Sequence, residues 1–235
     1  MIGFYDYTVL LTYFSLLSAS AGIIVSLSGP GGGYPYLGIF FLLFCGLCDA
    51  FDGKVASTKK KRSTMEKNFG IQIDSLSDLV AFGVLPACIG AAMLRTSPFF
   101  QSVLHIGDSI WYCVSIRFLL HVILVLYVLA ALIRLAYFNV TEEERQKKEK
   151  GTRKSYTGLP VTSASLIFPA IMLLQYIISV DITLIYFVAM IFTGVAFLLK
   201  FQLKKPGLRG ILLMVLFGFV EFGLLVFLKF YTHCL

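Results

Sequence analysis

The chain has 235 residues, of which 58% are hydrophobic, and its formal net charge is +7. Its mean hydropathy of +0.85 and its apolar share lie above those of soluble globular domains, so the composition excludes that class and indicates a membrane protein. The positive charge lies in short segments between apolar stretches. This distribution does not indicate a nucleic-acid partner, which would require one basic face on a folded domain.

Seven apolar stretches are predicted to be membrane-spanning helices. They cover residues 8–28, 36–57, 71–94, 112–140, 159–179, 182–200 and 209–230. We therefore predict an all-α, polytopic membrane helical bundle of about seven transmembrane helices, although six or eight fit almost as well. We expect residues 1–235 to form a single domain, with a six-helix catalytic core over about residues 8–200 and an extra C-terminal helix over about 209–230. The segment near residues 96–108 can hold a short interfacial helix.

Three short segments hold 16 of the 20 Lys and Arg residues. They are residues 54–67, 145–154 and 200–209. Because basic residues favour the cytoplasmic side of a membrane, all three are predicted to lie in the cytoplasm. The N-terminus then also starts in the cytoplasm, and with seven spans the C-terminus lies outside.

Four aspartates lie at helical spacing beside the first of these basic segments. The two runs are Asp49-x-x-Asp52-Gly53-x-x-Ala56 and Gly70-x-x-x-Asp74-x-x-x-Asp78. Residues three and four apart share one face of a helix, so each run brings its two carboxylates together. Acids at membrane depth persist mainly where they bind, pair or react. Because two divalent cations would neutralise four carboxylates and oxygen ligands suit Mg²⁺ or Mn²⁺, we predict a metal site.

Two glycines accompany these acids. Glycine inside a helix costs about 1 kcal/mol relative to alanine, so Gly53 and Gly70 indicate close approach by a ligand or another backbone. The alternative is that small residues such as these and Ala56 merely let helices pack. The glycines alone do not decide between the two interpretations.

The acidic pattern resembles the signature of the CDP-alcohol phosphotransferases, D-x2-D-G-x2-A-R followed after a gap by G-x3-D-x3-D. Residues 49–78 match it with one departure, Ser57, where the family usually has arginine. The segments FDGKVAS, FGIQIDSLSDLVAFGVLPA, RLAYFN (134–139) and TGLP (157–160) are similar to bacterial and archaeal integral-membrane phosphatidylserine synthases. The resemblance covers about residues 8–200.

The resemblance implies transfer of the phosphatidyl group from CDP-diacylglycerol to L-serine, with release of CMP. It implies that Asp49, Asp52 and Asp74 bind two divalent metal ions, Mg²⁺ or Mn²⁺, together with Asp78, which is also the general base. A homodimer among membrane lipids is implied too, in the cell membrane of a prokaryote with the active site facing the cytoplasm. The same chemistry with inositol phosphate, glycerol phosphate or choline as acceptor remains open.

The residues predicted to bind CDP are those beside the acids. They are Gly53, Lys54, Ala56, Ser57 and Gly70. Ser57 removes a cation next to the predicted diphosphate site, and Lys54 or a residue of the basic run 59–62 can replace it.

The residues predicted to bind the acceptor follow from the RLAYFN segment and the loop after it. They are Arg134, Asn139, Arg153 and Lys154. Arg134 is the candidate for the serine carboxylate, because a planar guanidinium suits bidentate binding. The alternatives are a snorkelling arginine at 134 and solvated loop charges at 153 and 154.

One basic side chain inside the membrane favours a zwitterionic acceptor over a phosphorylated one. A different alternative is a divalent-cation transporter that uses the four acids as an ion path. Acids gathered at one membrane face, rather than distributed across it, argue against such a path.

Overall fold

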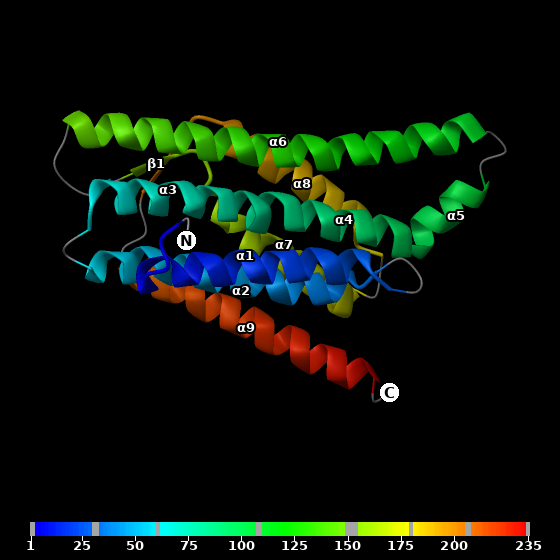
Figure 1. Ribbon diagram of the computed structural model, residues 1–235. Helices are drawn as coiled ribbons and strands as arrows, with labels where there is room; N and C mark the ends of the chain where they lie inside the picture. The colour runs from blue at the N-terminus through cyan, green and yellow to red at the C-terminus, as the bar shows by residue number, and fades with distance from the viewer. Residues whose placement is uncertain are drawn as a thin grey trace.

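Figure 1 shows the computed structural model, an elongated bundle of helices. The structure describes residues 3–29, 33–59, 62–106, 110–148, 155–178, 181–204 and 208–233. Its helical elements are α1 (Tyr7–Leu27), α2 (Pro35–Thr58), α3 (Thr64–Asp78), η1 (Leu79–Val84), α4 (Leu85–Thr96), α5 (Pro98–Ile106), α6 (Ile110–Lys148), η2 (Val161–Ser163), α7 (Ala164–Ile178), α8 (Thr183–Leu198) and α9 (Leu208–His233). The strands are β1 (Ser155–Thr157) and β2 (Gln202–Lys204). The predicted all-α fold is confirmed.

Four helical segments of the described chain are long and apolar enough to cross a membrane. They are Tyr7–Leu27, Pro35–Thr58, Thr64–Thr96 and Val114–Arg145. Three shorter apolar segments accompany them, Val161–Gln175, Thr183–Leu198 and Leu212–Leu228. Each of the seven predicted spans falls on one of these segments, and α5 forms the short helix predicted near residues 96–108.

Helices α1 and α2 pack closely because small residues lie where they meet. A side chain at Gly38 would collide with the Ser26 hydroxyl, and a Cβ added at Gly22 would lie 2.7 Å from Phe41 Cβ. The Ser18 hydroxyl donates to the Phe41 carbonyl oxygen at 3.1 Å. These contacts fix α2, which carries the first pair of acids, against α1.

Helix α3 begins at Thr64, seven residues before the predicted membrane span 71–94. Ser63 Oγ accepts from the Glu66 backbone N–H at 3.1 Å, and the Glu66 carboxylate accepts from the Ser63 N–H at 2.9 Å. This reciprocal capping box satisfies two backbone donors that a helix start otherwise leaves unpaired. Asp74 and Asp78 therefore lie well inside a helix, not near its start.

The helix changes pitch directly after Asp78, in the π-helical stretch η1. Pro86 follows at the start of α4 and lacks the N–H that would bond the Phe82 carbonyl oxygen in a regular helix. Tyr127 of α6 supplies that donor, because its hydroxyl lies 2.8 Å from the Phe82 oxygen. The irregular backbone beside Asp78 is thus satisfied within the bundle, as a membrane interior requires.

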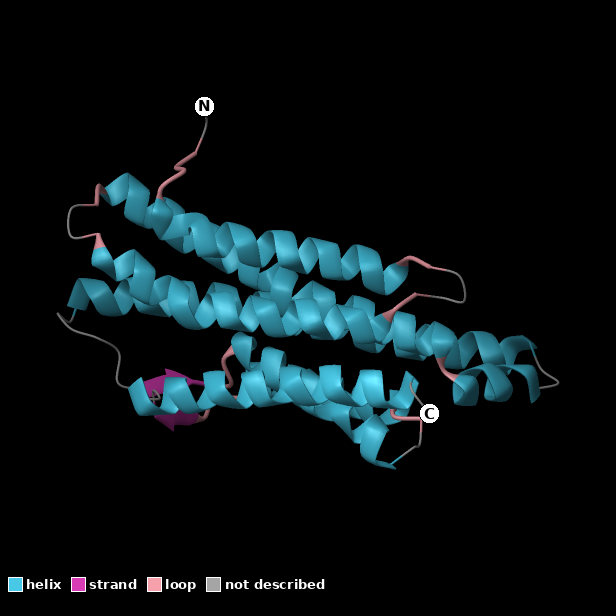
Figure 2. Cartoon of the chain, turned by 90° about the horizontal axis from the view of Figure 1, so that it is seen from below, coloured by secondary structure: helices cyan, strands magenta, loops and turns pink. Residues whose placement is uncertain are grey.

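The segment that leads into α7 is held by the strand pair, seen in Figure 2 at one end of the bundle. Strands β1 and β2 are antiparallel, with Tyr156 opposite Leu203. Gly158 follows with φ of 77°, and its N–H donates to the Phe201 carbonyl oxygen at 2.6 Å. A Cβ at Gly158 would lie 2.8 Å from the Leu199 carbonyl oxygen, so both the dihedral angle and the space require glycine.

Candidate functional site

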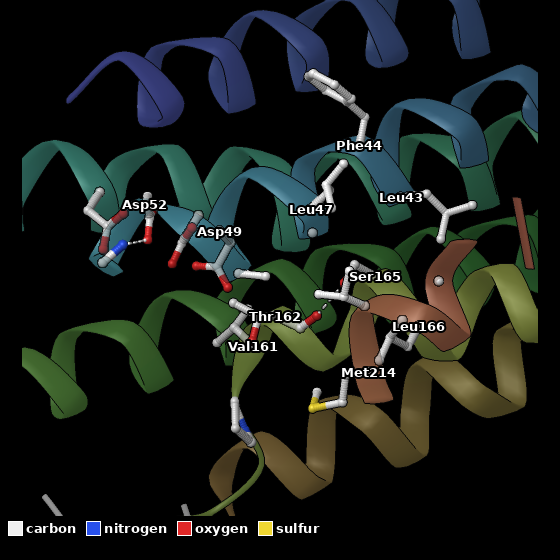
Figure 3. A pocket seen from close by; sticks show the side chains of 18 of the residues that line it. Leu43, Phe44, Leu47, Asp49, Asp52, Val161, Thr162, Ser165, Leu166 and Met214 are labelled. Atoms are coloured by element: carbon white, nitrogen blue, oxygen red, sulfur yellow. Dashed lines mark hydrogen bonds between the residues drawn. The ribbon is translucent and has the colours of Figure 1, made fainter. Parts of the chain in front are cut away.

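A pocket of about 880 Å³ is enclosed by residues of α2, α3, α6, η2, α7 and α9. Figure 3 shows Asp49 and Asp52 at one end, with the apolar side chains of Leu43 and Leu166 further along. Eight of the residues predicted from the sequence line it, namely Asp49, Asp52, Gly53, Lys54, Ser57, Asp74, Asp78 and Arg134. The pocket thus unites the acidic motif with the arginine predicted to bind the acceptor.

The four aspartates approach one another from α2 and α3. All four line the same pocket, where Asp74 is near enough to Asp52, and Asp49 near enough to Asp78, to interact electrostatically. The ion pairs found in the described part of the chain involve none of the four. These carboxylates therefore share one pocket in which no cationic side chain of the described residues is paired to any of them.

The chemistry of this donor set fits divalent cations. Carboxylate oxygens are the ligands that Mg²⁺ and Mn²⁺ prefer, and like charges this near one another need a counter-charge. Within the described residues, however, no group of three or more Asp, Glu, His or Cys side chains is already gathered closely enough to hold one ion. The four carboxylates thus fit divalent cations by the type of their donor atoms and by lining one pocket.

Open space lies beside Asp52 at the end of α2. A Cβ added at Gly53 would meet nothing within 4 Å, and the Gly53 N–H donates to the Asp52 carboxylate. One turn on, the Ser57 hydroxyl donates to the Lys54 carbonyl oxygen at 2.7 Å. Gly53 has no side chain to fill this part of the pocket. Lys54 is the basic side chain of α2 that lines the pocket.

Lys59 does not line the pocket and instead forms ion pairs at the ends of helices. Its ammonium group lies 2.6 Å from an Asp6 carboxylate oxygen and 3.3 Å from Glu66. The hydrogen bond from Lys59 to Asp6 holds the pKa of Asp6 below its ordinary value and raises the pKa of Lys59. Lys59 joins the starts of α1 and α3 and is not the pocket's replacement cation.

Arg62 also lies outside the pocket lining. A Cβ added at Gly70 would lie 2.9 Å from an Arg62 guanidinium nitrogen, so glycine there leaves room for this side chain. Neither Gly70 nor Ala56 lines the pocket. Four basic residues beside Lys54 were candidates to replace the family arginine, and two of them, Lys60 and Lys61, lie outside the described residues. Among the described candidates, Lys54 lines the pocket, whereas Lys59 and Arg62 do not.

Arg134 is 5% exposed and lines the pocket from α6. Its Nε donates to the Leu159 carbonyl oxygen at 3.1 Å, and its guanidinium carbon lies 5.6 Å from the centre of the Phe138 ring. A snorkelling arginine would reach the membrane surface, whereas this one is buried and lines the same pocket as Asp78. Its position suits a ligand-binding group.

Asn139, also predicted to bind the acceptor, does not line the pocket. The Asn139 side-chain amide donates to the Ser75 hydroxyl at 2.7 Å, which ties α6 to α3 between Asp74 and Asp78. Arg153 and Lys154 lie outside the described residues. Their predicted contacts with the acceptor stay predictions.

Two polar residues at the start of α7 complete the polar end of the pocket and were not predicted. Thr162 of η2 and Ser165 of α7 both line it. The Ser165 hydroxyl donates to the Thr162 carbonyl oxygen at 2.8 Å, while no hydrogen bond to the Thr162 hydroxyl is found in the described chain. A signal was available in the sequence, since both lie within five residues after the TGLP segment.

The rest of the pocket is an apolar arm that extends away from the acids. Its walls include Phe40 and Leu43 of α2, Leu166 of α7, and Val215, Gly218 and Phe222 of α9. The sequence predicted α9 as an extra helix outside the catalytic core. In the structure α9 packs on α2 and α7 and forms one side of the pocket.

Comparison with known proteins gives the class. Residues 8–202 match the CDP-alcohol phosphatidyltransferase family, and the chain belongs to that family. It is similar to a CDP-diacylglycerol–serine O-phosphatidyltransferase of Saccharomyces cerevisiae, with 36% identity over 123 residues, 52% of this chain and 36% of that protein. It is also similar to an archaetidylserine synthase of Methanothermobacter thermautotrophicus, with 30% identity over 155 residues, 65% of this chain and 52% of that protein. The matched part thus spans about half or less of each relative.

Proposed function

We propose that the chain transfers the phosphatidyl group of CDP-diacylglycerol to L-serine, forming phosphatidylserine and CMP. The observation that carries this proposal is a single pocket that joins four aspartates, a buried arginine and an apolar arm. Such a pocket suits a substrate with a charged head and an apolar tail. Both relatives bear names that specify serine lipids, which supports serine as the acceptor.

The acidic end would hold the cofactor. Asp49, Asp52 and Asp74, together with Asp78, are the residues proposed to bind two Mg²⁺ or Mn²⁺ ions. When bound, such ions neutralise carboxylates and offset the charge on a diphosphate and on the departing nucleotide. Gly53 leaves space beside Asp52, and Lys54, one turn before Ser57, is the basic side chain of α2 proposed to offset the missing family arginine.

Asp78 is proposed to act as the general base. Its carboxylate takes the proton of the serine hydroxyl, and the serine oxygen forms a bond to the phosphorus that carries the diacylglycerol. The bond between that phosphorus and the bridging oxygen breaks, and CMP leaves with the electron pair. A base must lie within hydrogen-bonding reach of its proton, and the pocket gives the Asp78 carboxylate access to a bound acceptor.

The acceptor is proposed to lie between Asp78, Arg134 and Thr162. The Arg134 guanidinium suits the serine carboxylate, and the Thr162 hydroxyl can donate to or accept from the acceptor. Lys54 and Arg134 are the basic side chains in the described pocket lining. Because Lys54 is proposed to lie near the diphosphate, Arg134 is the basic side chain left for the acceptor among the described lining residues. A single cation favours a zwitterionic acceptor over a phosphorylated alcohol.

We further propose that the acidic end faces the cytoplasm, because the basic segments flank it. The prokaryotic cell membrane and the homodimer follow from the resemblance alone. The archaeal relative is consistent with a prokaryotic membrane, whereas the yeast relative extends the similarity to eukaryotes.

The test is release of CMP by the purified protein from CDP-diacylglycerol, with serine, inositol phosphate, glycerol phosphate and choline as acceptors. We expect release that requires Mg²⁺ or Mn²⁺ and is fastest with serine. Faster CMP release with a phosphorylated alcohol than with serine would show that the acceptor is that alcohol and not serine. Absence of metal-dependent release with every acceptor would overturn the enzymatic proposal.

A divalent-cation transporter predicts a different result. In liposomes, it would move Mn²⁺ across the membrane without CDP-diacylglycerol and without forming CMP. We expect no such flux above that of liposomes without protein.

A further inference from the structure

The apolar arm is continuous with the acidic end of the pocket, and it runs along α2. Phe40 lies nine residues before Asp49 on the same helix, so the arm extends about 13 Å from the acids at 1.5 Å per residue. At its far end the Phe222 ring of α9 meets the Phe40 ring edge-on, with 5.3 Å between ring centres. The arm therefore has a defined direction and an aromatic end.

The wall formed by α9 depends on a glycine. Gly218 faces Leu166 of α7, and a Cβ added there would lie 3.6 Å from a Leu166 methyl carbon. A larger side chain at Gly218 would occupy the arm itself, because this residue lines it together with Val215 and Phe222. The width of the arm is thus set at one point by the absence of a side chain.

Part of the arm's wall also faces the surroundings of the bundle. Phe44 of α2 and Phe219 of α9 line the pocket and are 47% and 56% exposed. In a membrane these surroundings are lipid chains, and an arm walled by such apolar side chains has nothing to bond water. The chemistry selects a hydrocarbon chain as the occupant.

We propose that the apolar arm between α2, α7 and α9 binds one acyl chain of the CDP-linked lipid, and that α9 makes recognition depend on the length of that chain. This rests on the proposed function, which places the lipid's diphosphate at the aspartates. Helix α9 lies beyond residues 8–202, the part of the chain matched to the family. The family match therefore does not account for this wall.

The test compares two glycines of one helix. Gly218→Leu fills the arm, whereas Gly223→Leu places the same side chain where an added Cβ meets nothing within 4 Å and the residue does not line the pocket. CMP release is measured with dioleoyl and dihexanoyl CDP-diacylglycerol. We expect Gly218→Leu to raise KM for the long-chain lipid at least tenfold more than for the short-chain lipid, and Gly223→Leu to leave the ratio unchanged. An equal effect of Gly218→Leu on both lipids would overturn the inference.

A second measurement does not need turnover. A CDP-diacylglycerol with a photoreactive diazirine at the end of its acyl chain is irradiated with the protein, and the labelled peptides are identified by mass spectrometry. We expect label on α9 near Phe222, reduced in Gly218→Leu or, if that variant does not fold, in Val215→Phe. Label confined to other helices would overturn the inference. A labelled α9 in a protein that releases no CMP would reject the proposed reaction and keep the chain-binding arm.

Discussion

Gly46 of α2 and Ser165 of α7 lie in direct contact, so that a Cβ added at Gly46 would be 2.5 Å from Ser165 Cβ. Gly46 precedes Asp49 by one helical turn, and both Gly46 and Ser165 line the pocket. This contact sets how closely the start of α7, with Thr162, approaches the acids. A missing side chain on α2 therefore controls the distance between the two sides of the polar end.

We expect Gly46→Ala to separate α2 from α7 and to lower both stability and turnover, because overpacking a well-packed contact costs about 1–3 kcal/mol. Gly223→Ala, where an added Cβ meets nothing within 4 Å, is the matched control. The readouts are the temperature of unfolding in detergent and the rate of CMP release. Adding Ser165→Gly to Gly46→Ala should restore part of both. If the double variant were no better than Gly46→Ala, this contact would not be the cause.

Arg134 gives a prediction about the acceptor. Arg134→Lys keeps the charge but loses the planar fork, and charged hydrogen bonds contribute about 1.5–3 kcal/mol. We expect KM for serine to rise about 10- to 100-fold, since about 1.4 kcal/mol corresponds to a factor of ten, with little change in KM for CDP-diacylglycerol.

The control for this variant lies on the same helix. Arg117 of α6 is exposed and does not line the pocket, so Arg117→Lys should leave both KM values unchanged. If Arg134→Lys changed KM for the lipid and not for serine, Arg134 would belong to the nucleotide side of the pocket.

Tyr127 gives a prediction about stability. Tyr127→Phe removes the hydroxyl that bonds the Phe82 carbonyl oxygen and leaves that buried acceptor without its partner, at a cost of about 1–3 kcal/mol. We expect a lower temperature of unfolding. Tyr34→Phe is the control, because Tyr34 is 47% exposed. Equal unfolding temperatures for Tyr127→Phe and the unchanged protein would show that the hydroxyl does not stabilise this turn.

The pair formed by Asp6 and Lys59 gives a pH dependence. The hydrogen bond from Lys59 lowers the pKa of Asp6 in the folded protein, so its stabilisation is fully present above the unfolded value of about 3.9. It is lost as pH falls through the lowered folded pKa. We expect Asp6→Asn to reduce the temperature of unfolding at pH 7 and the difference from the unchanged protein to shrink below about pH 4. A difference that grew with falling pH would contradict this pairing.

The order of helices follows from apolar runs, so the seven apolar helical segments could be predicted, four of which are long enough in the described chain to cross a membrane. Helix α3 extends before the predicted span to a start at Thr64, which is fixed by the capping box of Ser63 and Glu66, whose spacing is the usual signal. The π-helical stretch η1 and the bond from Tyr127 to Phe82 could not be predicted. They depend on a helix distant in sequence that donates to a carbonyl freed by Pro86.

In the site, too, local features could be predicted from the sequence, whereas contacts between distant helices could not. The acids share a pocket because helical spacing and one connecting loop bring them together, and both features are local. Gly46 and Ser165 are in contact only once α7 has packed on α2, and α9 closes the pocket through its position in space. Asn139 was predicted to bind the acceptor from its place in the RLAYFN segment, and the structure adds that its amide donates to the Ser75 hydroxyl. A motif indicates which residues matter without stating which neighbour each will meet.

The central claim is that this pocket joins serine to a CDP-linked lipid with Asp78 as the base. The most direct measurement is incorporation of radiolabelled serine into chloroform-soluble lipid by the purified protein, compared between the unchanged protein and Asp78→Asn. Binding of CDP-diacylglycerol is measured on the same samples. We predict metal-dependent incorporation by the unchanged protein, loss of at least a hundredfold in Asp78→Asn by the usual contribution of a general base, and largely retained lipid binding. Normal incorporation by Asp78→Asn, or none by the unchanged protein, would contradict it.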